Sequence, residues 1–192
     1  MPLSSVVGAQ SIVKPGVCTS STRPASPYTG QMIYDTTVAT TLVWSGTAWI
    51  GSAGKVLQVV RAQTSTQVTN ATQSYADTGL TATITPSSTT STILVMVEQN
   101  GLSKLVGHAG STLFLKLFRG STELAFFLKD GGYTGTSIDN YFGGVGYMYS
   151  DSPATTAATT YKTQFANGVN ASGVMVQGST SFSTIVLMEI SA

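Results

Sequence analysis

The sequence predicts an all-β fold, and three of its features support this fold class. Serine and threonine are abundant, in runs such as 87–92 and 155–160. Threonine is β-branched and favours strands, while its hydroxyl group tolerates water. Charged residues make up only 9% of the chain, against roughly 25% in a typical soluble domain. Short apolar segments separated by turn residues recur at intervals of about 8–15 residues, which is typical of a sandwich or barrel.

Residues 1–30 are expected to form an extended N-terminal arm. They contain Pro2, Pro15, Pro24 and Pro27, carry few charges and show little hydrophobic periodicity. Proline fixes the backbone and interrupts regular structure, so this composition is unlike that of a packed domain. We therefore expect the arm to become ordered against another subunit or another protein.

Residues 31–54 are expected to form a small β-meander module that ends in a flexible linker. Its three short strands are predicted at 31–35, 41–44 and 47–50. Ser45 and Gly46 separate the second strand from the third, and glycine supplies the positive φ that a two-residue hairpin requires. The glycine- and serine-containing segment 51–54 then serves as the linker.

Two tryptophans supply most of the apolar area of this module. We expect Trp44 and Trp49 to lie in its core or at a contact between subunits. A platform for sugar binding is the alternative role for this pair.

Residues 55–192 are expected to form an antiparallel jelly-roll sandwich, the head domain. Nine strands are predicted, near 56–63, 79–84, 92–99, 112–119, 122–128, 141–149, 159–166, 173–177 and 182–190. This number of short strands suits a jelly roll, in which two antiparallel sheets pack face to face.

Several of these strands are apolar on both faces. Leucines occupy the odd positions from 113 to 117, whereas Phe114 and Phe118 lie on the opposite face. A strand of this kind is typical of a sheet that packs into a sandwich on one side and against a neighbouring subunit on the other. The segments 93–97 and 185–188 show the same two-sided character. We expect the head to associate, and we assign Phe114 and Phe118 to the contact.

A glycine-flanked region rich in aromatic residues contains Tyr133, Tyr141, Tyr147 and Tyr149. Tyrosine offers amphipathic contact area at a low cost in conformational entropy, which suits a recognition surface. Core and subunit-interface positions are the alternative for these four residues.

Few residues suit catalysis. His108 is the only histidine, so a histidine zinc site would need copies from several subunits, and no Gly-x-Ser-x-Gly motif accompanies it. The carboxylates show no spacing that selects a catalytic pair; they include Glu98, Glu123, Asp130, Asp139, Asp151 and Glu189. We expect no enzymatic activity, and we assign no catalytic, cofactor-binding or metal-binding residue.

The charge and cysteine content limit the possible partners and cellular location of the protein. The net charge is +1, without a block of like charge, which disfavours nucleic acid as a partner. Cys18 is the only cysteine, so an intrachain disulfide is excluded. The sequence shows neither a signal peptide nor an apolar run long enough to cross a membrane. We expect a protein made in the cytoplasm and not inserted into a membrane.

Two sets of segments resemble a known family. Residues 14–24, 27–35 and 43–49, with sequences KPGVCTSSTRP, PYTGQMIYD and VWSGTAW, resemble a module common in bacteriophage tail-fibre and virion structural proteins. Residues 75–80, 152–156 and 188–192 are similar to the C-terminal jelly-roll heads of such proteins, which resemble tumour necrosis factor-like trimers. The resemblance implies a homotrimer on the phage particle, with Phe114, Phe118, Trp44 and Trp49 as its expected trimer contacts.

The resemblance also implies a function. We expect a tail-fibre-like virion protein that attaches to a host-surface glycan or protein through the loops 100–111 and 129–140. Residues 1–30 would join it to other tail or capsid proteins. The alternative is a decoration protein that stabilises the phage capsid, since the sequence contains no heptad or repeat pattern for a fibre shaft. The receptor, the docking partner, the host and the copy number remain open.

Overall fold

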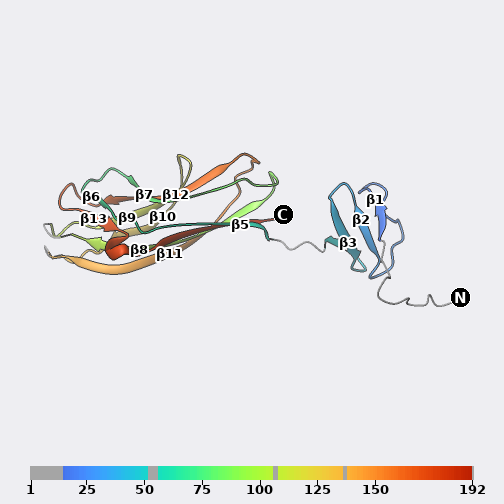
Figure 1. The fold of residues 1–192 in the computed structure, drawn as a ribbon, viewed down its shortest axis with the longest axis horizontal. Coiled ribbons are helices and arrows are strands. Elements are labelled where there is room, and N and C mark those ends of the chain that lie inside the picture. Colours follow the sequence, from blue (N-terminus) through green and yellow to red (C-terminus); the bar gives the residue numbers. More distant parts are fainter. Residues whose placement is uncertain (1–14, 52–55, 106–107, 136–137, 192) are drawn as a thin grey trace. The chain divides into compact units, whose positions relative to one another are not determined.

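The computed structural model describes residues 15–51, 56–105, 108–135 and 138–191 (Figure 1). The chain divides into two compact units, residues 1–54 and residues 55–192. Both units are built from β-strands, and the predicted all-β fold class is confirmed.

The N-terminal unit contains one four-stranded sheet with the order β1-β2-β3-β4. Its strands are β1 (Gly16–Cys18), β2 (Met32–Asp35), β3 (Thr40–Trp44) and β4 (Trp49–Gly51). β2, β3 and β4 form the expected antiparallel meander, and β1 adds to β2 in parallel. Residues 16–18 were expected in the extended arm, but they pair with β2 and so belong to this sheet. The first part of the arm, residues 1–14, lies outside the described residues.

The turn between β3 and β4 differs from the predicted two-residue hairpin. Trp44 pairs with Trp49, which leaves four residues in the loop. The Ser45 N–H donates to the Ala48 carbonyl at 2.9 Å, and the Ser45 hydroxyl oxygen accepts the Ala48 N–H at 3.0 Å. Gly46 takes the positive φ, 102°. The serine side chain thus closes a wider loop than the Ser-Gly pair alone indicates.

A buried carboxylate connects residues 20–23, which were expected in the extended arm, to this sheet. Asp35, at the end of β2, is fully buried and accepts hydrogen bonds from Arg23 Nε at 2.6 Å and from Ser20 Oγ at 3.0 Å. The Thr37 N–H donates to its other oxygen at 2.8 Å. Burial raises the pKa of Asp35, but these hydrogen bonds outweigh burial and lower it below its ordinary value. Residues 20–23 are therefore part of the folded module.

Within its described residues, the C-terminal unit contains ten strands. They are β5 (Val56–Thr64), β6 (Val68–Asn70), β7 (Ala76–Ile84), β8 (Thr92–Lys104), β9 (Leu113–Arg119), β10 (Thr122–Gly131), β11 (Asn140–Asp151), β12 (Thr159–Asn167), β13 (Val174–Val176) and β14 (Ser183–Ile190). A short 3-10 turn, η1 (Gly178–Thr180), precedes β14. All nine predicted strands are present, and β6 is an addition to them.

These strands form two antiparallel sheets. One has the order β10-β9-β12-β7, and the other has the order β5-β14-β8-β11, with β13 and β6 continuing beside the far end of β8. Strands of the first sheet lie above β8 and β11 in Figure 1. This alternation of strands between two sheets is the arrangement of a jelly roll, so the predicted sandwich is confirmed.

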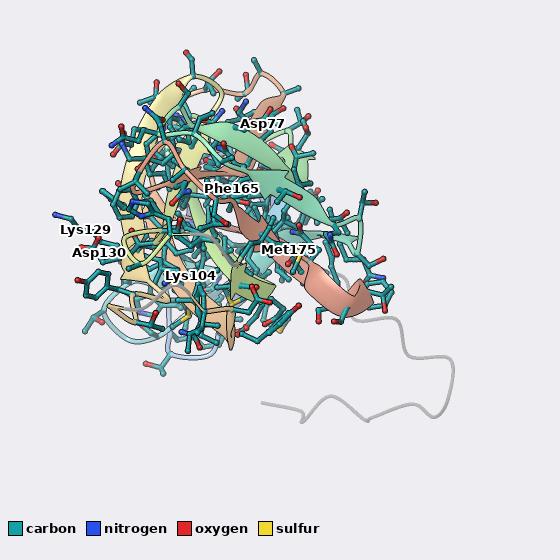
Figure 2. All side chains as sticks on the ribbon, turned by 90° about the vertical axis from the view of Figure 1, so that its left-hand side faces the viewer. Asp77, Lys104, Lys129, Asp130, Phe165 and Met175 are labelled. Atoms are coloured by element: carbon teal, nitrogen blue, oxygen red, sulfur yellow. The ribbon has the colours of Figure 1, made fainter. Side chains whose placement is uncertain are left out.

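Two apolar clusters fill the space between the sheets. The first includes Leu80, Ile93, Val95, Leu117, Tyr161, Ile185 and Leu187. The second includes Leu102, Leu113, Leu115, Phe165, Val174 and Val176. Figure 2 views the head from one end, with Phe165 in its interior and the exposed Lys129 and Asp130 at its edge.

A buried polar layer separates the two clusters. Gln99 donates to Ser183 Oγ at 3.1 Å and accepts from Thr163 Oγ1 at 2.9 Å. The hydroxyls of Thr163 and Thr78 lie 2.5 Å apart, and Gln177 donates to Ser183 Oγ at 3.2 Å. The chain of bonds runs from β7 through β12 to β8 and β14. Because buried polar groups need partners, this layer fixes the register of both sheets together.

Candidate functional site: an apolar sheet face

The outward surface of the β5-β14-β8-β11 sheet is largely apolar. Along β8 and β14 the fully buried residues alternate with half-buried residues that point away from the core. Outward-pointing apolar residues are Val59, Leu94, Met96, Met148, Val186 and Met188. We call this set the methionine face. Two of its members are open to solvent, since Val59 is 54% exposed and Met148 is 69% exposed.

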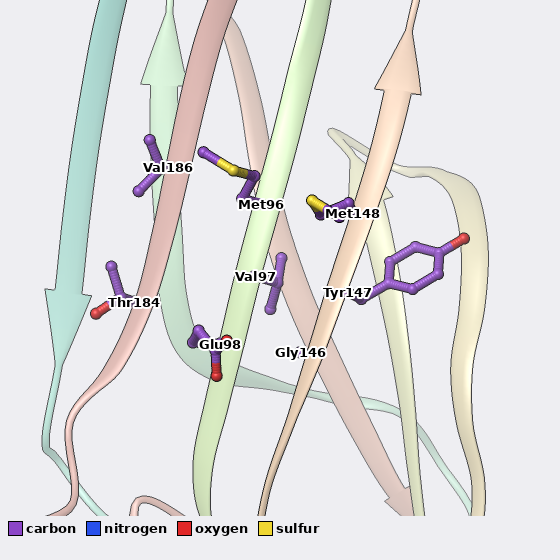
Figure 3. A pocket seen from close by; sticks show the side chains of 8 residues that line it. All are labelled: Met96, Val97, Glu98, Gly146, Tyr147, Met148, Thr184 and Val186. Carbon is purple, nitrogen blue, oxygen red and sulfur yellow. The ribbon is translucent and has the colours of Figure 1, made fainter.

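Strand pairing aligns the members of the methionine face in two neighbouring rows. The register gives the rows Val59–Met188–Leu94 and Val186–Met96–Met148. Figure 3 shows Met96 and Met148 beside each other on β8 and β11, with Val186 on the adjacent strand. Cross-strand neighbours of this kind form a continuous surface, which a neighbouring protein can cover as a unit.

A shallow hollow of about 380 Å³ lies within this surface. Met96, Met148 and Val186 line it on the apolar side, and Glu98 and Thr184 line it on the polar side. Methionine is flexible and polarisable, so it adapts to the shape of a packing partner. The hollow therefore suits an apolar side chain of a neighbouring molecule better than it suits a charged ligand.

The opposite sheet presents the phenylalanines that were expected at the trimer contact. Phe114 packs edge-on against Phe126, with ring centroids 5.6 Å apart. The Lys116 ammonium lies 4.3 Å from the centroid of the Tyr75 ring and 5.1 Å from that of Phe126. Phe114 and Phe118 are half-buried. This aromatic group is thus covered in part by side chains of its own subunit, including a lysine.

The structure divides the four tyrosines of the aromatic-rich region into two pairs. Tyr147 and Tyr149 pack against the first core cluster, and the Tyr147 ring stacks on Phe127 at 5.2 Å. Tyr133 and Tyr141 are 66% and 64% exposed. Alternation along β11 accounts for the inward pair, because positions 147 and 149 share the face of the sheet that meets the core. The exposed pair is available for recognition.

The two tryptophans lie opposite each other on β3 and β4. Their ring centroids are 5.4 Å apart, and the rings are tilted by 60°. Both are half-buried, while Ile33 and Leu42 are the buried apolar residues of this unit. Trp44 and Trp49 therefore cover the small sheet as a cross-strand pair.

Asp151 is engaged in a structural cluster at one edge of the sandwich. Arg119 Nη1 contacts both carboxylate oxygens of Asp151 at 2.8 Å, and the Tyr161 hydroxyl donates to Oδ2 at 2.6 Å. Burial raises the pKa of Tyr161, and its hydrogen bond to the Asp151 carboxylate raises it further. Both oxygens of this carboxylate are occupied, so its role here is to join β11 to β9 and β12.

Glu189 is a second buried carboxylate with structural partners. It accepts two hydrogen bonds from Ser87, through N–H at 2.7 Å and Oγ at 2.6 Å, and one from Gln58 Nε2 at 2.5 Å. Burial raises the pKa of Glu189, but these bonds outweigh it and lower the pKa from 4.5 to about 2. The ionised carboxylate holds the loop after β7 against β5 and β14.

The remaining polar candidates lie apart from one another. Nδ1 of the exposed His108 accepts the Gly110 N–H at 3.0 Å. Lys104 is fully buried, and its ammonium donates to the Ala109 carbonyl at 3.1 Å and to Thr134 Oγ1 at 2.8 Å. Within the described ranges, no three His, Cys, Asp or Glu side chains are placed to hold a metal ion. In the same ranges, no helix has the length and apolarity needed to cross a bilayer.

The sequence indicated part of the methionine face. Segments 93–97 and 185–188 were singled out as apolar on both faces, and they supply the two central strands of this surface. The contributions of Val59 and Met148 were missed, because the same-face positions near them include Arg61 and Gln63 in one strand and Gly146 and Ser150 in the other. Val59 and Met148 join the rows of the central strands because β5 pairs with β14 and β11 pairs with β8.

The sequence matches no protein-family model, and it matches no curated protein. Among solved structures, the chain is similar to the VP2 subviral particle of infectious bursal disease virus, with 18% identity, a TM-score of 0.40, and coverage of 76% of this chain and 40% of that chain. A structure of the Gx strain of the same virus gives 16% identity, a TM-score of 0.39, and coverage of 76% and 39%. The chain thus spans about two fifths of the length of these viral chains.

Proposed function

We propose that this chain is a bacteriophage virion structural protein whose head forms a homotrimer and is displayed on the particle for attachment to the host surface. The methionine face carries the proposal, because a continuous apolar sheet surface on a charge-poor protein favours association. Covering one methionine or valine side chain stabilises an assembly by about 1.5–3 kcal/mol, whereas association costs about 4–15 kcal/mol of lost freedom. Several such side chains must therefore be covered together.

We take the trimeric state from the resemblance of the head to tumour necrosis factor-like trimers, and the methionine face supports it by offering an extended apolar surface that a different surface of a neighbouring subunit can cover. Around a three-fold axis, each subunit would cover part of the face of the next. The aromatic group around Phe114 and Phe126 is the competing contact.

The N-terminal unit is the proposed link to the particle. Residues 16–23 of the proposed anchor 1–30 belong to the folded module, so residues 1–14 are the part that can be removed without deleting β1 or Arg23. Removal of residues 1–14 should leave a trimer that no longer enters particles. Removal of residues 1–30 should in addition unfold the module, because it deletes β1 and the Arg23 partner of Asp35. Normal incorporation of the shorter truncation would contradict the anchoring role.

Capsid decoration is the second candidate function. It is favoured by the short segment 51–54, which connects the module to the head without any repeated or heptad pattern for a shaft. A decoration protein would use the same trimer and the same anchor, but would occupy many sites on the capsid.

Two measurements test these proposals. Sedimentation of the purified full chain should give a trimer that persists on dilution, and a stable monomer would contradict association through the methionine face. Quantitative mass spectrometry of purified particles then counts copies. Hundreds of copies would exclude a tail fibre, whereas a few dozen would exclude a general capsid cement.

A further inference from the structure

A second hollow lies in the head, apart from the methionine face. Its volume is about 480 Å³. Three segments that are distant in the sequence form its walls: residues 100–102 of β8, residues 141–144 of β11, and residues 178–182 before β14. Among the described residues that line it, none carries a charge.

Glycines bring these segments close together and keep the hollow open. Gly101 has a φ of 62°, and a Cβ there would collide with the backbone of Gly178, including its carbonyl oxygen at 2.7 Å. At Gly144, a Cβ would collide with the Asn100 side-chain amide, and it would lie 2.9 Å from the Gln99 carbonyl. Side chains at Gly101 or Gly144 would push these walls apart, so this arrangement requires glycine.

The wall before β14 has an unusual backbone. Gln177, Ser179 and Thr180 have φ angles of 53°, 53° and 58°, in the left-handed region that non-glycine residues rarely adopt. The Gln177 N–H donates to the Asn100 carbonyl at 2.9 Å, and Asn100 Nδ2 donates to the Phe182 carbonyl at 2.9 Å. These bonds hold the turn against β8. Backbone strain of this kind clusters at ligand sites, where it sets the shape of the site in advance.

The side chains at the rim combine open aromatic rings with neutral polar groups. Tyr141 is 64% exposed and Phe182 is 57% exposed, which is unusual for large apolar rings. Asn100, Ser179 and Ser181 line the same hollow as these rings. Aromatic rings pack on apolar C–H faces, while amides and hydroxyls both donate and accept hydrogen bonds.

This combination selects a ligand that is apolar on its faces and rich in hydroxyls at its edges. A pyranose ring has this character. A phosphate, a carboxylate or a basic peptide would find no charge partner among the lining residues, so the desolvation of its charge would be uncompensated. A small site with apolar walls and a few convergent polar groups is the usual form of a binding pocket.

We propose that the hollow between Tyr141 and Phe182 binds a neutral saccharide unit of a host-surface glycan. The inference rests on the proposed attachment function and names its ligand class and its binding residues. Segment 100–102 belongs to the loop region expected to contact the host, while 178–182 is an unexpected contributor.

The test uses the full chain on an array of neutral glycans, acidic glycans and peptides. The wild-type protein should bind neutral glycans, and the single variants Tyr141→Ala and Phe182→Ala should each weaken that binding by about tenfold or more. Tyr28→Ala is the matched control, because Tyr28 is a similarly exposed tyrosine, at 70%, that does not line the hollow. It should bind as the wild type does. Thermal unfolding of all three variants checks that they remain folded.

Binding to acidic glycans or peptides alone would overturn the saccharide assignment, as would neutral-glycan binding that survives both substitutions. Failure to bind any neutral glycan would also overturn it. Sedimentation and particle counting separate this result from the proposed function. If the protein is a trimer found in particles but binds no neutral glycan, only the saccharide assignment fails. If it binds neutral glycans but is absent from particles, the proposed virion function fails.

Discussion

The Tyr161 hydroxyl donates a 2.6 Å hydrogen bond to Oδ2 of Asp151, and this bond joins the two sheets of the head. Tyr161 lies on β12 of one sheet, and Asp151 ends β11 of the other. Arg119, at the end of β9, contacts both oxygens of the same carboxylate. One buried charge thus receives donors from two strands across the sandwich.

Replacing Tyr161 with phenylalanine should therefore destabilise the head. The change removes a hydrogen bond to a charged group without removing the ring, and we expect the free energy of unfolding to fall by about 1.5–3 kcal/mol. Urea unfolding measures it. Tyr149→Phe is the matched control, since within the described residues the Tyr149 hydroxyl has no hydrogen bond, and its effect should be smaller. Equal effects of the two substitutions would show that the contact across the sheets contributes little.

Glu189 predicts a specific dependence of stability on pH. Its pKa is lowered to about 2 in the folded state, against 4.5 as the ordinary value. A lowered pKa means that the stabilisation is fully present above the ordinary value and is lost as the pH falls toward the folded value. The free energy of unfolding should fall more steeply in the wild type than in Glu189→Gln as the pH drops from about 5 to about 2. The prediction would be contradicted if the difference in free energy of unfolding between the wild type and Glu189→Gln stayed the same from neutral pH down to the bottom of this range.

The methionine face can be distinguished from the aromatic group as the contact between subunits. Met148→Glu places a charge on an open position of the face, where burial against a neighbour would leave it unpaired. It should convert the proposed trimer to monomer in sedimentation experiments. Phe126→Glu introduces the same charge on the opposite sheet, at a residue that is 43% exposed, and should leave the trimer intact. The reverse pattern would assign the contact to the aromatic group.

Gly101 should be among the least replaceable glycines of the head. Alanine at a positive φ costs about 1–2 kcal/mol on its own, and the collision with Gly178 adds about 1–3 kcal/mol. Gly79 has a φ of 83° but open space around its missing side chain, so Gly79→Ala isolates the backbone cost. Chemical denaturation should show that Gly101→Ala lowers the stability more than Gly79→Ala does. Similar losses would mean that the turn at residues 177–180 shifts without cost.

Several long strands of the head could be predicted because they show alternation, as β9 does, or a dense apolar, β-branched run, as β8 and β14 do. The two short strands that were missed, β1 and β6, have three residues each and lack that signal. β1 lies beside Pro15 in a segment whose composition indicates an extended arm, and its pairing with β2 depends on contacts such as that of Arg23 with Asp35. Such contacts are between residues distant in the sequence, so local patterns do not reveal them.

The candidate sites show the same limit. Two-sided apolar segments revealed the centre of the methionine face, but which side of each strand faces outward depends on how the sheets pair. Tyr141 and Tyr147 were predicted as one aromatic group, and the structure places one outside and the other against the core. The hollow at Tyr141 and Phe182 depends on the close approach of Gly101 and Gly178, which are far apart in the sequence.

The polar layer through Gln99 and Thr163 divides the interior of the head into two apolar regions, and Phe127 packs against both of them. The first cluster lies under the central part of the methionine face, whereas the second lies toward the end that contains Leu102. Substitutions that reshape the turns around Leu102 need not loosen the packing beneath Met96. Sequence changes at the Leu102 end can therefore accumulate with less effect on the region beneath Met96.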